Sequence, residues 1–117
     1  MAGVVIQKLR KRSKDEYGVA ESYYSILSSV NGLKLTQREI QLVAFMAINR
    51  AIPYSEMKRK FCERNSGTSE QTISNMISRL KKPKVIIKEK GRLKVHPSIA
   101  LSFNEGLLLQ ITLENGI

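Results

Sequence analysis

The chain of 117 residues contains one cysteine and no tryptophan. Because Cys62 has no second cysteine to join, the sequence excludes an intramolecular disulfide and a cysteine-rich zinc site. Cys62 follows Phe61 in an expected helix, so we expect a small core residue rather than a nucleophile. No apolar run reaches the roughly 18 residues that a membrane span requires, and the N-terminal apolar residues precede the charges, the reverse of a secretory signal. We therefore expect no membrane contact and a cytoplasmic location.

Residues suited to catalysis are also scarce. His96 is the only histidine, so acid–base schemes or metal clusters that need several histidines are not available. Glu39 and Glu70 fall in the first turns of expected helices, where a negative charge interacts favourably with the helix dipole. Gly67 and Gly91 are isolated at turns and form no phosphate-binding loop. We expect no enzymatic activity, no metal site and no cofactor.

Acidic residues are outnumbered, because the chain has 20 lysines and arginines against 10 aspartates and glutamates and a net charge of +10. Residues 1–14 contain five basic and no acidic residues, and residues 54–94 contain 12 basic and four acidic residues. Such clusters favour a polyanionic partner, since each neutralised phosphate releases condensed counterions. The alternative is that the basic residues only keep the surface soluble.

Apolar periodicity and capping residues predict the helices that precede residue 68. A helix with a wide apolar face is expected within residues 15–32, ending at Asn31 and Gly32. Thr36 to Glu39 has the form of a capping box, and the helix from Ile40 to Ile48 is apolar nearly all round, so it should be central and buried. A shorter helix is expected from Pro53 to the turn at residues 65–67. The inner faces are expected to contain Tyr17, Ala20, Tyr23, Tyr24, Ile26, Leu27 and Val30 in the first of these helices, and Tyr54, Met57 and Phe61 in the third.

The most informative stretch covers residues 68–96. Thr68 to Gln71 has the form of a second capping box, and Pro83 ends the helix that begins there. Two strands around Gly91 then form a basic hairpin. One helix face is apolar, with Ile73, Met76, Ile77 and Leu80, and the other is polar, with Gln71, Asn75, Ser78 and Lys82 flanked by Thr72 and Arg79. In the hairpin, Leu93 and Val95 are expected to point inward, and Arg92, Lys94 and His96 outward.

Terminal segments flank this region on both sides. Gly3 to Leu9 is expected as a short strand followed by a basic run, so residues 1–14 form a basic arm. After the hairpin, a turn and a short helix are expected within residues 97–104. The alternation of apolar residues from Leu107 to Leu113 favours a strand, although the same stretch could continue a helix begun near Ser98. Residues 98–117 are therefore expected to pack on the N-terminal segment or on a second chain.

The order of these elements resembles the winged helix-turn-helix superfamily, in particular its bacterial and phage transcription regulators. The resemblance covers residues 33–97 and is carried by the stretches LTQREIQLVAFMAI, YSEMKRKFCERN, GTSEQTISNMISRLKKPKVI and IKEKGRLKVHP. It implies a mainly α fold with a small β-hairpin wing (α+β), here with an extra N-terminal helix and terminal strands. Two departures stand out: Lys82-Pro83-Lys84 replaces the glycine that such regulators usually have after the recognition helix, and we expect no separate effector domain, so ligand-controlled regulation is not implied.

A helix-turn-helix places the N-terminal residues of its second helix against base edges in the major groove. We therefore expect helix 69–82 to read bases and wing 85–96 to contact the backbone or the minor groove. The residues expected to read bases are Gln71, Thr72, Asn75 and Arg79. The residues expected to contact phosphates are Lys58, Arg59, Ser69, Lys82, Lys88, Lys90, Arg92 and Lys94.

The first hypothesis is a small, dimeric transcriptional regulator that binds double-stranded DNA selectively and associates with the nucleoid. The second is a winged-helix assembly module, for example in a phage virion, packaging or connector protein, whose basic faces meet DNA or an acidic protein without reading sequence. RNA binding is weaker, since few exposed aromatic residues are available for base stacking.

Overall fold

The computed structural model describes residues 5–115, and within them it contains four α-helices and one two-stranded antiparallel sheet. This arrangement agrees with the mainly α, α+β class that the sequence predicts. None of the helices in this range is both long and apolar enough to span a bilayer. The elements are α1 (Glu16–Val30), α2 (Gln37–Ile48), α3 (Tyr54–Arg64), α4 (Glu70–Lys81), β1 (Ile86–Glu89), β2 (Arg92–Val95) and the short 3-10 helix η1 (Pro97–Ile99).

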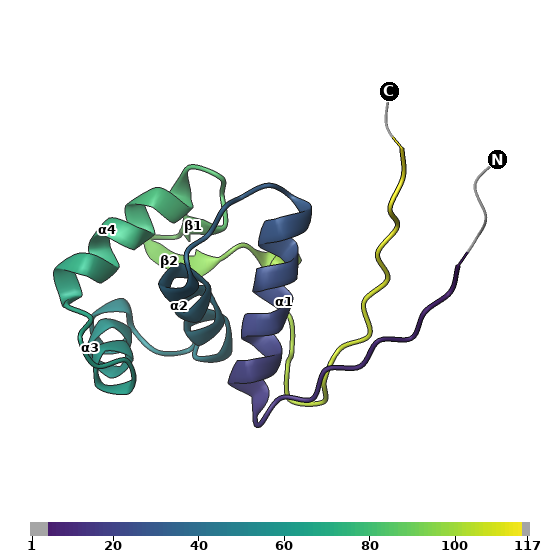
Figure 1. The fold of residues 1–117 in the computed structure, drawn as a ribbon. Coiled ribbons are helices and arrows are strands. Elements are labelled where there is room, and N and C mark those ends of the chain that lie inside the picture. Colours follow the sequence, from purple (N-terminus) through teal and green to yellow (C-terminus); the bar gives the residue numbers. More distant parts are fainter. Residues whose placement is uncertain (1–4, 116–117) are drawn as a thin grey trace.

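Helix α2 lies in the middle of the molecule, between α1 on one side and α3 and α4 on the other (Figure 1). It begins at the capping box that the sequence predicts: Thr36 Oγ1 accepts from the Glu39 backbone N–H, and Glu39 Oε1 accepts from the Thr36 backbone N–H. Leu42, Val43 and Phe45 are buried in the core. The prediction of a central helix that is buried on nearly all sides is confirmed.

Helix α1 packs along α2 and begins at Asp15, whose side chain accepts from the backbone N–H of Gly18. Ala20 and Tyr24 are buried, and the Tyr24 hydroxyl donates to the carbonyl of Ile99 at 2.6 Å. The predicted apolar face is too wide at its margin, because Ile26 and Val30 are exposed. They lie on the side of α1 turned away from α2, where no other described element covers them.

Helix α3 buries Met57 and Phe61 and packs against α4. Helix α4 begins one residue later than the capping box suggests, since Ser69 and not Thr68 is the capping residue. Ser69 Oγ accepts from the Thr72 backbone N–H at 3.1 Å, whereas the Thr68 backbone N–H donates to the Asn65 carbonyl in the preceding turn. Thr68 is therefore part of the turn between α3 and α4.

The predicted hairpin forms from β1 and β2, with Ile86 opposite Val95 and Glu89 opposite Arg92. Lys90 and Gly91 connect the strands, and both have positive φ angles, 52° and 77°. This is the pattern of a type I′ turn, whose twist matches that of the flanking strands. Val95 is buried and Arg92 is exposed, as predicted.

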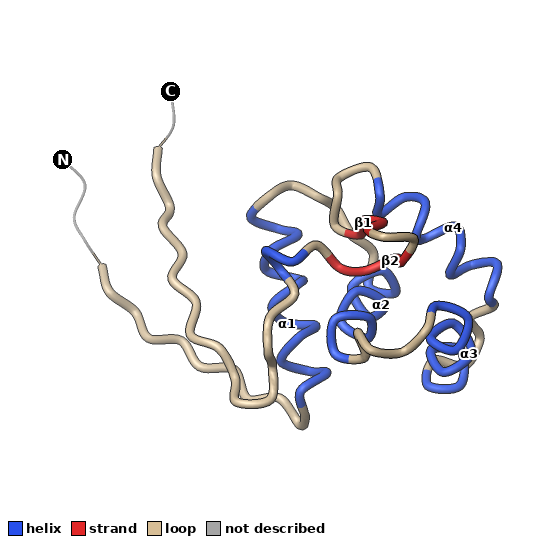
Figure 2. Tube along the Cα trace, turned by 180° about the vertical axis from the view of Figure 1, so that it is seen from behind, coloured by secondary structure: helices blue, strands red, loops and turns tan. Residues whose placement is uncertain are grey.

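The strands predicted at the two termini do not form. Residues 5–14 and 104–115 contain neither helix nor strand, and residues 3 and 4 of the first prediction lie outside the described range. A strand requires a hydrogen-bonded neighbour, and neither segment has one among residues 5–115. Phe103, packed against Tyr23 and Tyr24, is the last buried residue of the described part of the chain. Beyond it the C-terminal segment leaves on the far side of α1, as does the N-terminal arm (Figures 1 and 2).

Candidate nucleic-acid interface

Helix α4 has one buried face and one polar face, as its periodicity predicts. Ile73, Met76, Ile77 and Leu80 are buried. The side chains on the other face are exposed: Gln71, Thr72, Asn75, Ser78 and Arg79. The structure therefore places the four residues expected to read bases on one exposed face of α4, with Gln71, Thr72 and Asn75 in its first and middle turns and Arg79 in its last turn.

The polar residues at the start of α4 are connected in pairs. Gln71 Nε2 donates to Asn75 Oδ1 at 3.0 Å, one helical turn further on. The hydroxyls of Ser69 and Thr72 are 2.9 Å apart. These contacts restrict the rotamers of the side chains before any ligand arrives, so less conformational entropy is lost on binding.

Arg79 has a different environment from the other three. Its Nε lies 3.1 Å from Oε2 of Glu39, the residue that completes the capping box of α2. The side chain of Glu39 is 6% exposed and that of Arg79 is 58% exposed. Arg79 thus fixes α4 to the start of α2. Its two Nη atoms form no hydrogen bond with residues 5–115 and point to a mostly exposed surface.

The environment of Glu39 favours its ionised form. Burial alone would raise the pKa of this carboxyl group, but hydrogen bonds from Thr36 and Arg79 and the charge of Arg79 together lower the pKa below its ordinary value of 4.5. The carboxylate uses one oxygen for the capping box and the other for Arg79. Glu39 was expected only to cap its helix, and the sequence contains no local signal for the second contact.

The basic residues of α3 are largely neutralised by nearby carboxylates. Lys58 Nζ lies 3.8 Å from Glu70, and Arg59 Nη1 lies 2.7 Å from Glu63. Lys60 is similarly paired with Glu56. Lys58 and Arg59, both expected to contact phosphates, therefore contribute less free positive charge than the sequence suggests.

Uncompensated positive charge is concentrated in two places among residues 5–115: in the N-terminal arm, whose five basic residues form no ion pair in this range, and, apart from Arg79, after the middle of α4 and in the hairpin. Lys94 is paired with Glu89 at 2.9 Å. The remaining basic residues of this region form no ion pair with any residue in the range 5–115, and all are exposed: Lys81, Lys82, Lys84, Lys88, Lys90 and Arg92. We call these six residues the basic surface. The predicted set lacked Lys81 and Lys84, although their position beside Lys82 in the sequence KKPK could have indicated them.

Two lysines of the basic surface adopt a backbone conformation that disfavours them. Lys84 has φ 61° and occupies the left-handed position after α4. Its backbone N–H donates to the carbonyl of Lys81, and the backbone N–H of Val85 donates to the carbonyl of Leu80. This is a Schellman motif, in which glycine is the usual residue. Lys90 has φ 52° at the first position of the hairpin turn, where asparagine is common. Lysine is thus present twice where a smaller residue would be less strained.

The described residues show little sign of other chemistry. Among residues 5–115, no three histidine, cysteine, aspartate or glutamate side chains lie close enough together to hold a metal ion. Cys62 is half-buried against the core, and burial together with the charge of Glu70 raises the pKa of its thiol, which favours the unreactive protonated form. The side chain of His96 accepts from the Ser98 backbone N–H and caps η1.

The chain matches no protein-family model, no curated protein and no solved structure. The binding properties of this surface are therefore inferred from its own residues.

Proposed function

We propose that residues 33–97 form a winged helix-turn-helix module that binds double-stranded DNA, with α4 in the major groove and the hairpin on the backbone or the minor groove. The order of α2, α3, α4 and hairpin supports this proposal. In such a module the second helix of the pair lies in the groove and presents its N-terminal residues to the bases. We infer no catalytic step, and the module serves as a small transcriptional regulator.

The observation that carries the proposal is the basic surface. It extends from the last turn of α4 to the hairpin turn, adjoining the polar face of the same helix. Lysines that form no ion pair in the folded chain lose no such contact when they bind a phosphate. By contrast, Lys58 and Arg59 must first leave Glu70 and Glu63. Phosphate binding and counterion release are therefore expected mainly from the hairpin side.

The strained lysines provide a second argument. A left-handed conformation costs a non-glycine residue about 1–2 kcal/mol, and such strain tends to occur at functional positions. Two of the three lysines with positive φ, Lys84 and Lys90, belong to the basic surface, and the third, Lys34, lies in the loop between α1 and α2. Their positive charge at these places is consistent with a binding role that outweighs the loss of stability.

Base reading is proposed for Gln71 and Asn75 acting as one unit. Their mutual hydrogen bond leaves Gln71 Oε1 as an acceptor and Asn75 Nδ2 as a donor on the exposed face. The major-groove edge of adenine presents the complementary pair, an N6 donor and an N7 acceptor. One adenine bridged by both side chains would use this arrangement without breaking the existing bond.

A second candidate function is a winged-helix assembly module that grips DNA without reading its sequence. It is favoured by the observation that Arg79 is already held by Glu39 and that Gln71 and Asn75 satisfy part of each other's hydrogen-bonding capacity. In this case only the basic surface matters, and any duplex is an adequate ligand.

Equilibrium binding to a labelled duplex at several salt concentrations tests the proposal. For the variant Lys88→Gln/Lys90→Gln we expect weaker binding. A plot of the logarithm of the binding constant against the logarithm of salt concentration should become less steep by about one to two, since each lost phosphate contact removes about 0.9 from its slope. Lys60→Gln is the matched control, because Lys60 is paired with Glu56 on α3. Equal effects of the two changes, or no binding by the parent chain, would overturn the proposal.

A further inference from the structure

Strand β2 has one edge that no other described strand pairs with. The His96 backbone N–H donates to the Val85 carbonyl at 2.9 Å, and hydrogen-bonded and non-hydrogen-bonded pairs alternate along an antiparallel ladder. Leu93 and Val95 therefore lie in non-hydrogen-bonded pairs, with their backbone N–H and C=O groups directed away from β1. Within residues 5–115, no backbone hydrogen bond outside the hairpin involves either residue. Such an edge is a template for one more strand.

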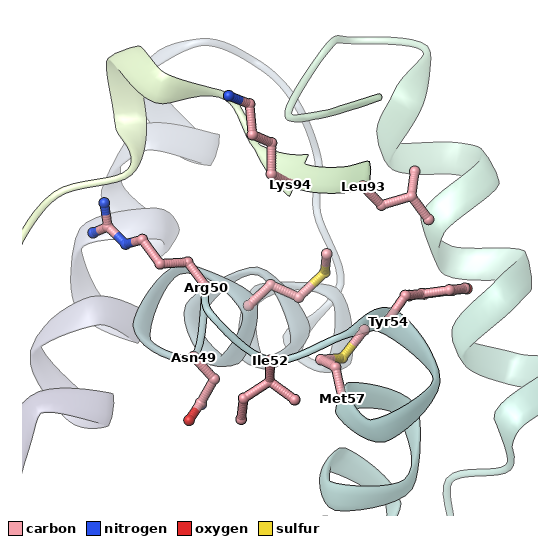
Figure 3. A pocket seen from close by; sticks show the side chains of 8 residues that line it. Asn49, Arg50, Ile52, Tyr54, Met57, Leu93 and Lys94 are labelled. Atoms are coloured by element: carbon pink, nitrogen blue, oxygen red, sulfur yellow. The ribbon is translucent and has the colours of Figure 1, made fainter. Parts of the chain in front are cut away.

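A hollow of about 320 Å³ lies along this edge, between β2 and the end of α2. Met46, Ala47 and Val95 supply apolar surface to it. A smaller hollow shares Met46, Arg50, Leu93 and Lys94 with it and continues toward Ile52 and Tyr54 (Figure 3). We call the two hollows together the β2 groove. Its charged lining residues are the basic Arg50, Lys90, Arg92 and Lys94 and the acidic Glu89, which pairs with Lys94 and leaves the other three as the basic charge of the groove.

The C-terminal segment of the chain has the features of a strand that lacks a partner. Its apolar residues alternate at positions 107, 109, 111 and 113, and all four are at least 38% exposed. Residues 104–117 contain two acidic residues, Glu105 and Glu114, and no basic residue. In both views the segment lies beyond α1, away from the hairpin of its own chain (Figures 1 and 2).

We propose that the β2 groove binds residues 107–113 of a second copy of the chain as an added antiparallel or parallel strand. Alternate side chains of a strand point to the same face, so Leu109 and Ile111 can enter the apolar part of the groove together. The acidic ends of the segment match the basic lining residues. Two copies that exchange their segments reciprocally form a closed dimer with a twofold axis. This assembly requires no DNA and goes beyond the proposed binding function.

The first test is sedimentation velocity of the full chain in buffer without DNA. We expect the parent chain to be a dimer at micromolar concentration. For Leu109→Asp we expect a dimer dissociation constant at least about tenfold higher, because a charge replaces an apolar side chain in the interface. Leu108→Asp is the matched control: Leu108 is 99% exposed and lies on the opposite face of the extended segment. A parent chain that stays monomeric, or equal effects of the two changes, would overturn the inference.

Disulfide formation between two differently labelled chains locates the interface. Both chains carry Cys62→Ser, one also carries Lys94→Cys, and the other carries Leu108→Cys, Gln110→Cys or Thr112→Cys in turn. The side chain of residue 94 lies on the face of β2 opposite that of Val95, and the side chains of residues 108, 110 and 112 lie on the face of the added strand opposite that of Leu109. We therefore expect one of the three cysteines to form a disulfide with residue 94 of the other chain. Bonds only between two chains of the same kind, or no bond between the two kinds of chain at any of the three positions, would contradict the inference. DNA affinity is measured on the same variants, so failure of this dimer and failure of DNA binding are distinguished.

Discussion

Arg79 and Glu39 form a 3.1 Å ion pair that joins the exposed side of α4 to the capping box at the start of α2. The pair is asymmetric, because the carboxylate is buried and the guanidinium is largely exposed. One buried residue thus completes the capping box of α2 and also contacts α4. The pair adds a polar contact to the packing of the buried apolar face of α4.

Replacing Glu39 by glutamine is expected to lower the free energy of unfolding by about 1–3 kcal/mol. The buried carboxylate that accepts two hydrogen bonds becomes a neutral amide, which can accept only through its single oxygen. Urea denaturation followed by circular dichroism measures this change. Glu63→Gln is the control, because Glu63 is 62% exposed and its ion pair with Arg59 is on the surface. We expect about 0.5 kcal/mol or less for the control; a similar loss for both variants would show that the capping box and Arg79 do not depend on the charge of Glu39.

The lowered pKa of Glu39 predicts how stability depends on pH. A carboxyl group whose pKa is lower in the folded chain stabilises the fold above its ordinary pKa of 4.5, and this contribution disappears as pH falls through the lower, folded value. We therefore expect the parent chain to lose stability below about pH 4.5, and the Glu39→Gln variant to lose less over the same range. Parallel curves of the two proteins in acid would contradict the assignment.

The strained lysines predict a trade between stability and binding. Lys84→Gly and Lys90→Asn should each raise the free energy of unfolding by about 0.5–1 kcal/mol, because glycine and asparagine tolerate positive φ better than lysine does. Each should also weaken DNA binding by removing one phosphate contact. Lys34→Gly provides the control, since Lys34 has φ 56° in the loop between α1 and α2, outside the basic surface. Thermal melts and duplex binding of all three variants test this, and an equal loss of affinity for Lys34→Gly would refute it.

Much of the fold could be predicted because its signals are local. Capping residues and apolar periodicity indicated the four helices, and Gly91 between alternating residues indicated the hairpin. The sequence suggested Thr68 as the cap of α4, but Thr68 and Ser69 are equivalent by residue type, and only the backbone of the preceding turn distinguishes them. The prediction of terminal strands rests on a short apolar run at residues 4–6 and on alternation at residues 107–113, and neither pattern can show whether a partner strand exists.

The sequence indicates which residues lie at the candidate site better than it indicates which of their charges are paired. Residues 40 positions apart in the sequence, such as Glu39 and Arg79, pair only because the fold brings α2 and α4 together. The same holds for Lys58 and Glu70, which join α3 to α4. The left-handed lysines could not be foreseen either, because propensity favours glycine or asparagine there. Sequence therefore indicated which face is basic, and the structure shows which of its charges are unpaired among the described residues.

If Gln71 and Asn75 read one adenine together, their effects on binding should not add. We expect Gln71→Ala and Asn75→Ala each to weaken binding to the preferred duplex by about 1–3 kcal/mol, and the double variant to be only slightly worse than either single one. Binding isotherms for the four proteins complete the cycle. Additive losses would mean that the two side chains contact separate bases, and no loss would favour the assembly module.

The most direct test of the central claim is selection of bound duplexes from a random-sequence pool, followed by comparison of the selected duplex with a scrambled one at two salt concentrations. We expect a recovered palindrome that binds more tightly than the scramble at both concentrations, with the difference reduced by Asn75→Ala. No enrichment of any sequence, with binding to every duplex that fades equally as salt rises, would contradict sequence-selective recognition and leave only the phosphate contacts of the basic surface.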